Sequence, residues 1–95
     1  MAIRSFKSKI TAELYEGILP KKGFPQDLVK SARRKLAMLN AAIGLNDLKS
    51  PSGNKLHELY GDRKGQHAIR INDQFRIYFF WTDLGVEDVE ITDYH

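Results

Sequence analysis

Three segments that alternate between apolar and polar residues decide the fold, and they lie in QHAIRINDQFRIYFFWTDLGVEDVEITDYH, residues 66–95. A period of two is typical of β-strands with one buried face. Asn72-Asp73 and Asp83-Leu84-Gly85 are turn residues that separate the segments. We therefore expect an antiparallel meander of strands over 66–71, 75–81 and 86–94. A shorter strand, bracketed by Leu56 and Leu59, precedes them across the glycine-bounded turn at 61–65.

Upstream of residue 50 the apolar residues recur every three or four positions, which predicts helices. The first helix begins after a Ser8 cap and ends at Glu16, because Gly17 suits a left-handed helix end. Its apolar stripe comprises Ile10, Leu14 and Ile18. The second helix runs from about 26 to 42 and buries one apolar face, formed by Leu28, Val29, Ala32, Leu36, Leu39 and Ile43.

The opening segment Ile3–Phe6 alternates and predicts a brief first strand. We expect an α+β fold in which this strand and the two helices pack on one face of the meander. At 95 residues the chain has the size of one domain, covering 1–95.

Composition narrows the function classes. The chain has no apolar run long enough to span a membrane and no secretory leader, which favours a cytoplasmic protein. It has no cysteine, and its histidines, His57, His67 and His95, are dispersed. We therefore expect chemistry that needs no metal.

The net charge of +3 is unevenly distributed. Residues 1–49 carry ten Lys/Arg and four Asp/Glu, whereas residues 50–95 carry five and eight. Four basic residues of the second helix should point largely outward, namely Lys30, Arg33, Arg34 and Lys35. They form either a solvated face or a contact surface for RNA or an acidic partner.

Alternation also predicts what the second face of the sheet presents. If Ile69, Ile71, Ile77, Phe79, Val89 and Ile91 pack on the helices, the opposite face carries Arg70, Arg76, Tyr78, Glu90, Thr92 and Tyr94. The guanidinium group of arginine can bind a phosphate through two parallel hydrogen bonds, and aromatic rings can stack on bases. This face is therefore a candidate RNA groove. Two of these residues have an alternative role. Arg76 could form an ion pair with Glu90 or Asp93, and Tyr78 could be a packing residue. Arg63 is expected to stabilise its own turn.

The chain ends in Asp93-Tyr94-His95, a carboxylate, a phenol and an imidazole in sequence. Histidine titrates near neutrality and both takes and returns a proton at physiological pH. These residues are the candidate active site, although a polar end of a strand is a common feature without function.

Taken together, the segments resemble the HigB-type toxins of the RelE/ParE superfamily, the toxin halves of bacterial type II toxin–antitoxin modules. The resemblance covers nearly the whole chain and rests on five segments, at 3–6, 34–39, 61–67, 69–77 and 93–95. It implies an enzyme that needs no metal or cofactor and cuts messenger RNA in the ribosomal A site. The implied partners are the ribosome and a helix-turn-helix, HigA-like antitoxin, with operator DNA bound only through that antitoxin.

Carried over by motif, Asp93 and His95 resemble the acid/base groups, Tyr94 a substrate-positioning residue and Arg76 the phosphate-stabilising arginine. Lys55, His57 and Arg70 are further candidate RNA contacts, as is Tyr60. Some relatives have a lysine at the Tyr60 position, so Lys55 and His57 would supply part of the missing charge. Two alternatives stay open: a ParE-like toxin that inhibits DNA gyrase, and a noncatalytic RNA- or antitoxin-binding module.

Overall fold

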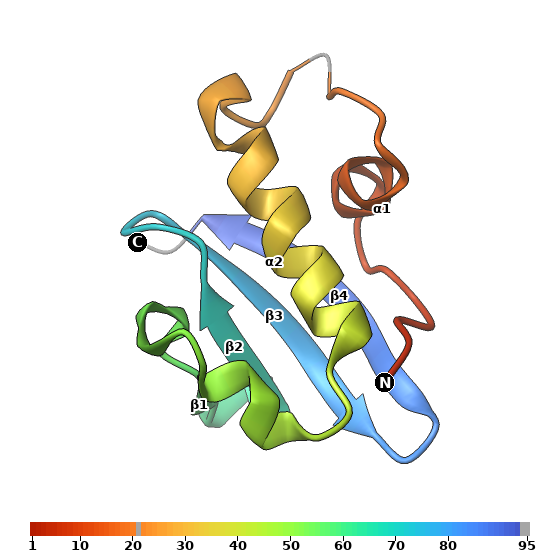
Figure 1. Ribbon diagram of the computed structural model, residues 1–95, viewed down its shortest axis with the longest axis vertical. Helices are drawn as coiled ribbons and strands as arrows, with labels where there is room; N and C mark the ends of the chain where they lie inside the picture. Colours follow the sequence, from red (N-terminus) through yellow and green to blue (C-terminus); the bar gives the residue numbers. More distant parts are fainter. Residues whose placement is uncertain (21, 94–95) are drawn as a thin grey trace.

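The computed structural model describes residues 1–20 and 22–93. Within them an antiparallel sheet runs in the order β1-β2-β3-β4. Its strands are β1 (His57–Glu58), β2 (Gln66–Arg70), β3 (Phe75–Thr82) and β4 (Gly85–Asp93). The α-helices, α1 (Lys9–Glu16) and α2 (Val29–Ala41), lie on one face of that sheet (Figure 1). The predicted α+β architecture is confirmed.

The ends of α1 lie where its capping residues indicate. Ser8 Oγ accepts a hydrogen bond from the Thr11 amide at 3.2 Å, and Gly17 takes a left-handed φ of 88°. The helix therefore stops at Glu16. Ile18 falls beyond it and is exposed, so the prediction that Ile18 belongs to the buried stripe is wrong.

The helical region from 26 to 41 consists of a short 3-10 helix, η1 (Gln26–Leu28), followed directly by α2. Val29, Ala32, Leu36 and Leu39 are buried, as expected. Ile43 is 87% exposed, contrary to prediction, because Ala42 is extended and the helix ends before Ile43. Further 3-10 turns follow, η2 (Leu45–Lys49), η3 (Ser52–Asn54) and η4 (Gly61–Arg63).

The basic residues of α2 do not all point outward. Lys30 and Arg34 are exposed, as predicted. Arg33 is half-buried and its Nε donates to the Leu14 carbonyl of α1 at 3.1 Å. Lys35 is only 9% exposed. The prediction fails at these two positions because α2 is flanked by α1 and by residues 45–54, a tertiary arrangement that helical periodicity does not specify.

The strand register confirms the predicted helix-facing side of the sheet. Ile69 is paired with Ile77, which is paired with Ile91, so these three lie on one face. Phe79 and Val89 join this face with no exposed surface. Burial of such side chains against the helices is the main favourable term that holds the two layers together.

The N-terminal segment lies beside β4 as two isolated parallel bridges, Ile3 to Val86 and Phe6 to Val89. The segment predicted as a brief first strand thus extends the sheet at β4, but it is too briefly paired to form a regular strand. Within the described residues no helix is both long and apolar enough to cross a membrane.

Candidate functional site

The face of the sheet opposite the helices presents two rows of residues across neighbouring strands, and most of these residues are polar. One row contains His57, Ala68, Tyr78 and Glu90, paired in that order from β1 to β4. The next row contains Arg70, Arg76 and Thr92. The predicted open face is thus assembled by register, with His57 added from β1.

Arg70 and Arg76 are direct cross-strand partners. Side chains in such positions have Cβ atoms about 5 Å apart, and like charges placed there repel. Arg70 forms an ion pair with Asp73. Arg76 Nη1 donates to the carbonyls of Phe75, at 3.2 Å, and Asn72. The two half-buried arginines thus bring positive charge together at this end of the sheet, an arrangement that an anion would stabilise.

Glu90 has a charge partner in Arg63. It accepts from Arg63 Nη1 at 3.3 Å. Glu90, one of the two candidate ion-pair partners of Arg76, therefore forms an ion pair with an arginine from another element.

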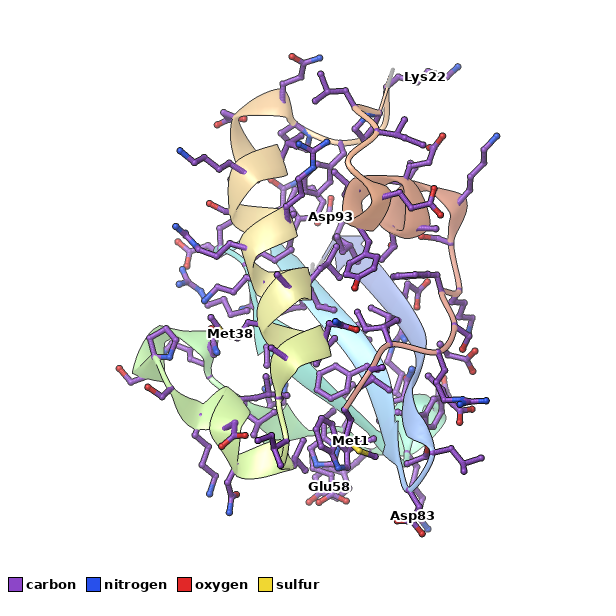
Figure 2. The ribbon with its side chains drawn as sticks, turned by 45° about the vertical axis from the view of Figure 1, so that its right-hand side comes forward. Met1, Lys22, Met38, Glu58, Asp83 and Asp93 are labelled. Carbon is purple, nitrogen blue, oxygen red and sulfur yellow. The ribbon has the colours of Figure 1, made fainter. Side chains whose placement is uncertain are left out.

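Asp93 is the last residue of β4 and is paired with Phe75. Its Oδ2 accepts from Gln74 Nε2 at 3.0 Å. Because it shares the Phe75 side of the sheet, Asp93 lies on the face opposite Arg76, at the same end of the strands. Figure 2 shows it at the end of β4, between the two helices. A cavity of about 430 Å³ adjoins it, lined by residues that include Ser8, Phe24, Phe75 and Ile91.

Tyr94 and His95, the other predicted catalytic residues of the C-terminus, lie outside the described residues. The structure thus brings Arg70, Arg76 and Asp93 to one end of the sheet. Their predicted roles stay predictions.

The candidate RNA contacts near β1 are exposed. Tyr60 is 76% exposed, and Lys55 and His57 are exposed as well. His57 is exposed because β1 is the edge strand of the sheet. His57 Nδ1 lies 2.9 Å from the Lys55 carbonyl oxygen. Since a carbonyl only accepts, Nδ1 carries the hydrogen, and Nε2 of the neutral ring is left as an acceptor.

Arg63 stabilises its own turn through a hydrogen bond to Gln66, as predicted, and also makes contacts that the sequence did not indicate. Beyond its own turn it crosses the open face, with its guanidinium carbon 4.1 Å from the centroid of the Tyr78 ring. Its Nη1 also donates to Gln66 Oε1 at 3.2 Å and to Glu90. Tyr78 is 6% exposed beneath it, so contact between RNA and this ring requires Arg63 to move. The glycines that flank η4 indicated a turn but not its direction.

Lys7 is a second cation near this face that the sequence did not indicate. It lines a hollow of about 400 Å³ together with Asp62, Arg63, Gln66 and Phe80. Across residues 1–20 and 22–93, no group of three or more His, Cys, Asp or Glu side chains is arranged to hold a metal ion.

Comparison with known families identifies the chain. The model for the RelE-like toxin of type II toxin–antitoxin system HigB matches residues 4–95. The chain belongs to this toxin family. The family resemblance drawn from its motifs is thereby confirmed.

Individual relatives agree. The toxin is 37% identical over 78 residues to Toxin HigB-1 of Vibrio cholerae serotype O1, covering 82% of each chain. It is 38% identical over 65 residues to an uncharacterized protein of Haemophilus influenzae, covering 68% of this chain and 64% of the relative. A chain of the YoeB-YefM complex from Staphylococcus aureus has a similar structure, with a TM-score of 0.61 and 18% sequence identity. The match covers 100% of this chain and 99% of the chain in that complex. This last likeness concerns the fold.

Proposed function

We propose that this toxin is a ribosome-dependent endoribonuclease that cuts messenger RNA in the ribosomal A site. The observation that carries the proposal is the cross-strand pair of Arg70 and Arg76 at the end of the sheet where Asp93 closes β4. Two arginines paired across β2 and β3 suit binding of a phosphodiester, and Asp93, at the same end of the strands but on the other face of the sheet, carries a group capable of proton transfer.

In the proposed reaction the 2′-hydroxyl of the RNA attacks the adjacent phosphorus. A base takes the hydroxyl proton, the bond from phosphorus to the 5′-oxygen breaks, and an acid protonates that oxygen. The products are a 2′,3′-cyclic phosphate and a free 5′-hydroxyl. Asp93 and His95 are the proposed acid and base, Tyr94 positions the substrate, and Arg76 stabilises charge on the phosphate. No step requires a metal or cofactor.

The remaining contacts hold the RNA strand. Lys55, His57 and Tyr60 are exposed along one edge of the open face, where they are accessible to a single strand. Arg70 shares the phosphate with Arg76. Tyr78 contributes a ring once Arg63 leaves it, since the guanidinium covers the ring in the free protein.

The proposed partners are the ribosome with its messenger, in the cytoplasm, and a HigA-like helix-turn-helix antitoxin. Operator DNA would be bound only through that antitoxin. An antitoxin partner is supported by membership of a toxin–antitoxin family and by the structural likeness to a chain of the YoeB-YefM complex.

The test is primer-extension mapping of a defined messenger on programmed ribosomes and as free RNA. Wild type should cut only on ribosomes. Arg76→Gln should cut roughly 100-fold more slowly, as expected for loss of a charge-stabilising donor. His95→Gln should cut more slowly still or not at all. Lys30→Gln removes an exposed charge from α2 and should cut like wild type.

Two results would contradict the proposal. Growth arrest on expression without ribosomal cuts would direct attention to DNA gyrase, as in the ParE branch of the superfamily. Binding to RNA or antitoxin without either effect would instead indicate a noncatalytic module, for which Tyr60 in place of a lysine is the motivating feature.

A further inference from the structure

Lys35 is a buried cation in the hydrophobic layer. It lies on the inner side of α2 between core residues and is 9% exposed, although lysine is almost never buried unless it is paired. Burial lowers the pKa of its ammonium group, and the positive charges of Arg34 and Arg70 lower it further. A residue held in this way at an electrostatic cost points to a specific contact.

Its partner is Asn54, at the end of η3. Lys35 Nζ donates to Asn54 Oδ1, and Asn54 has no exposed surface. Asn54 Nδ2 in turn donates to the carbonyls of Leu48 at 3.1 Å and Ser50 at 3.4 Å. Lys35 thus completes a buried polar network that fastens residues 48–54 to α2, and such networks specify one arrangement when every member is satisfied.

The residues directly after this anchor belong to the proposed RNA site. Lys55 takes a left-handed backbone conformation, with φ 47° and ψ 48°, and its carbonyl holds His57 Nδ1. The strand that follows pairs with β2 through His57 and Glu58, and the Leu59 amide donates to the Gln66 carbonyl at 2.9 Å. So short an edge strand is weakly held by its own pairing, so the anchor at Asn54 helps to fix its position.

We propose that Lys35, through Asn54, is a positioning residue for the RNA site: it fixes residues 55–57 so that the Lys55 carbonyl holds Nδ1 of His57 and leaves Nε2 free to accept a hydrogen bond from the ribose of the RNA. The inference rests on the proposed function for the role of His57 in RNA contact. Its structural part, that Lys35 sets the state of the His57 ring, stands by itself.

The test compares Lys35→Met with wild type and with Lys30→Met, a matched control on the exposed side of the same helix. Nitrogen-15 NMR of the His57 ring reports which nitrogen carries the hydrogen. In wild type and Lys30→Met the hydrogen should reside on Nδ1. In Lys35→Met the two nitrogens should become more nearly equivalent as the ring leaves the Lys55 carbonyl.

Cleavage on ribosomes supplies the second readout. The cutting rate of Lys35→Met at saturating ribosomes should fall by roughly 10- to 100-fold, since misplacing a contact by about 1 Å has effects of that order. The ribosome concentration at half-maximal rate should rise as well, because Lys55 and His57 are among the residues proposed to hold the RNA strand. Lys30→Met should match wild type in both quantities.

Chemical rescue distinguishes the effect of losing the Lys35 amine from a general disturbance of the fold. The chain contains no cysteine, so Lys35→Cys carries a single thiol that can be aminoethylated in denaturant before refolding. The product restores an amine of nearly the length of lysine, and both the ring signal and the cutting rate should return. Wild type taken through the same cycle is the control. If Lys35→Met fails to fold, Lys35→Gln, which cannot span the distance to Asn54, replaces it.

An unchanged His57 ring in a folded Lys35 variant would overturn the inference. So would a cutting rate equal to that of wild type. If wild type cuts no messenger at all, the proposed function fails, while the ring signal still decides whether Lys35 positions His57.

Discussion

Arg63 makes side-chain contacts that join three elements at the open face of the sheet. Its guanidinium lies 4.1 Å from the Tyr78 ring centroid and 3.3 Å from Glu90, which joins η4 to β3 and β4. Arg63→Met should lower the free energy of unfolding by about 1–2 kcal/mol, through loss of a cation–π contact and a charged hydrogen bond. Urea denaturation measures this. Arg34→Met, an exposed control on α2, should change little, and equal midpoints for the two variants would contradict the assignment.

Lys35 should give the toxin a pH-dependent stability. Because burial lowers its pKa in the folded state, the unfolded chain binds more protons between that pKa and 10.5, and stability therefore rises with pH in this window. Urea denaturation at pH 7 and pH 10 should show wild type gaining stability relative to Lys35→Met. Lys30→Met should keep the slope of wild type. If the free energy of unfolding changed equally with pH in wild type and Lys35→Met, the buried ammonium would not be destabilised.

At the scale of elements, the turn that joins β3 to β4 also receives the N-terminal segment. Gly85 has a φ of 144°, and a Cβ there would lie 2.6 Å from the Ala2 carbonyl oxygen. Gly85→Ala should therefore destabilise the fold by about 2 kcal/mol, through strain and displacement of residues 2–4. Gly53→Ala, where no atom lies within 4 Å of the added Cβ, should range from neutral to a gain of about 1 kcal/mol. Equal melting temperatures for the two variants would contradict this account.

The elements themselves were largely predictable from local sequence. Ser8 and Gly17 marked both ends of α1, and the alternation around Ile69 and Ile77 predicted which face of the sheet is buried. Ile43 was misplaced because periodicity continues past the point where the backbone leaves the helix. Local patterns describe which residues share a face, but not where an element stops when no capping residue marks its end.

At the scale of the whole molecule, the parts of the site that sequence could not specify depend on long-range packing. Arg63 meets Glu90 across 27 positions, and Lys35 meets Asn54 across 19. Neither contact leaves a periodic signal, so one arginine was assigned to its own turn and one lysine to solvent. Arg70 and Arg76 were found because both lie in regular strands, where alternation decides the face.

We propose that this member of the HigB-like toxin family cuts messenger RNA on the ribosome with its C-terminal acid/base groups and Arg76. The most direct test is primer extension on programmed ribosomes with wild type and His95→Gln, alongside the same messenger without ribosomes. We predict cuts with wild type on ribosomes, none on free RNA, and their loss in the variant. Undiminished cutting by His95→Gln would contradict the assigned chemistry, and growth arrest without any ribosomal cuts would contradict the claim itself.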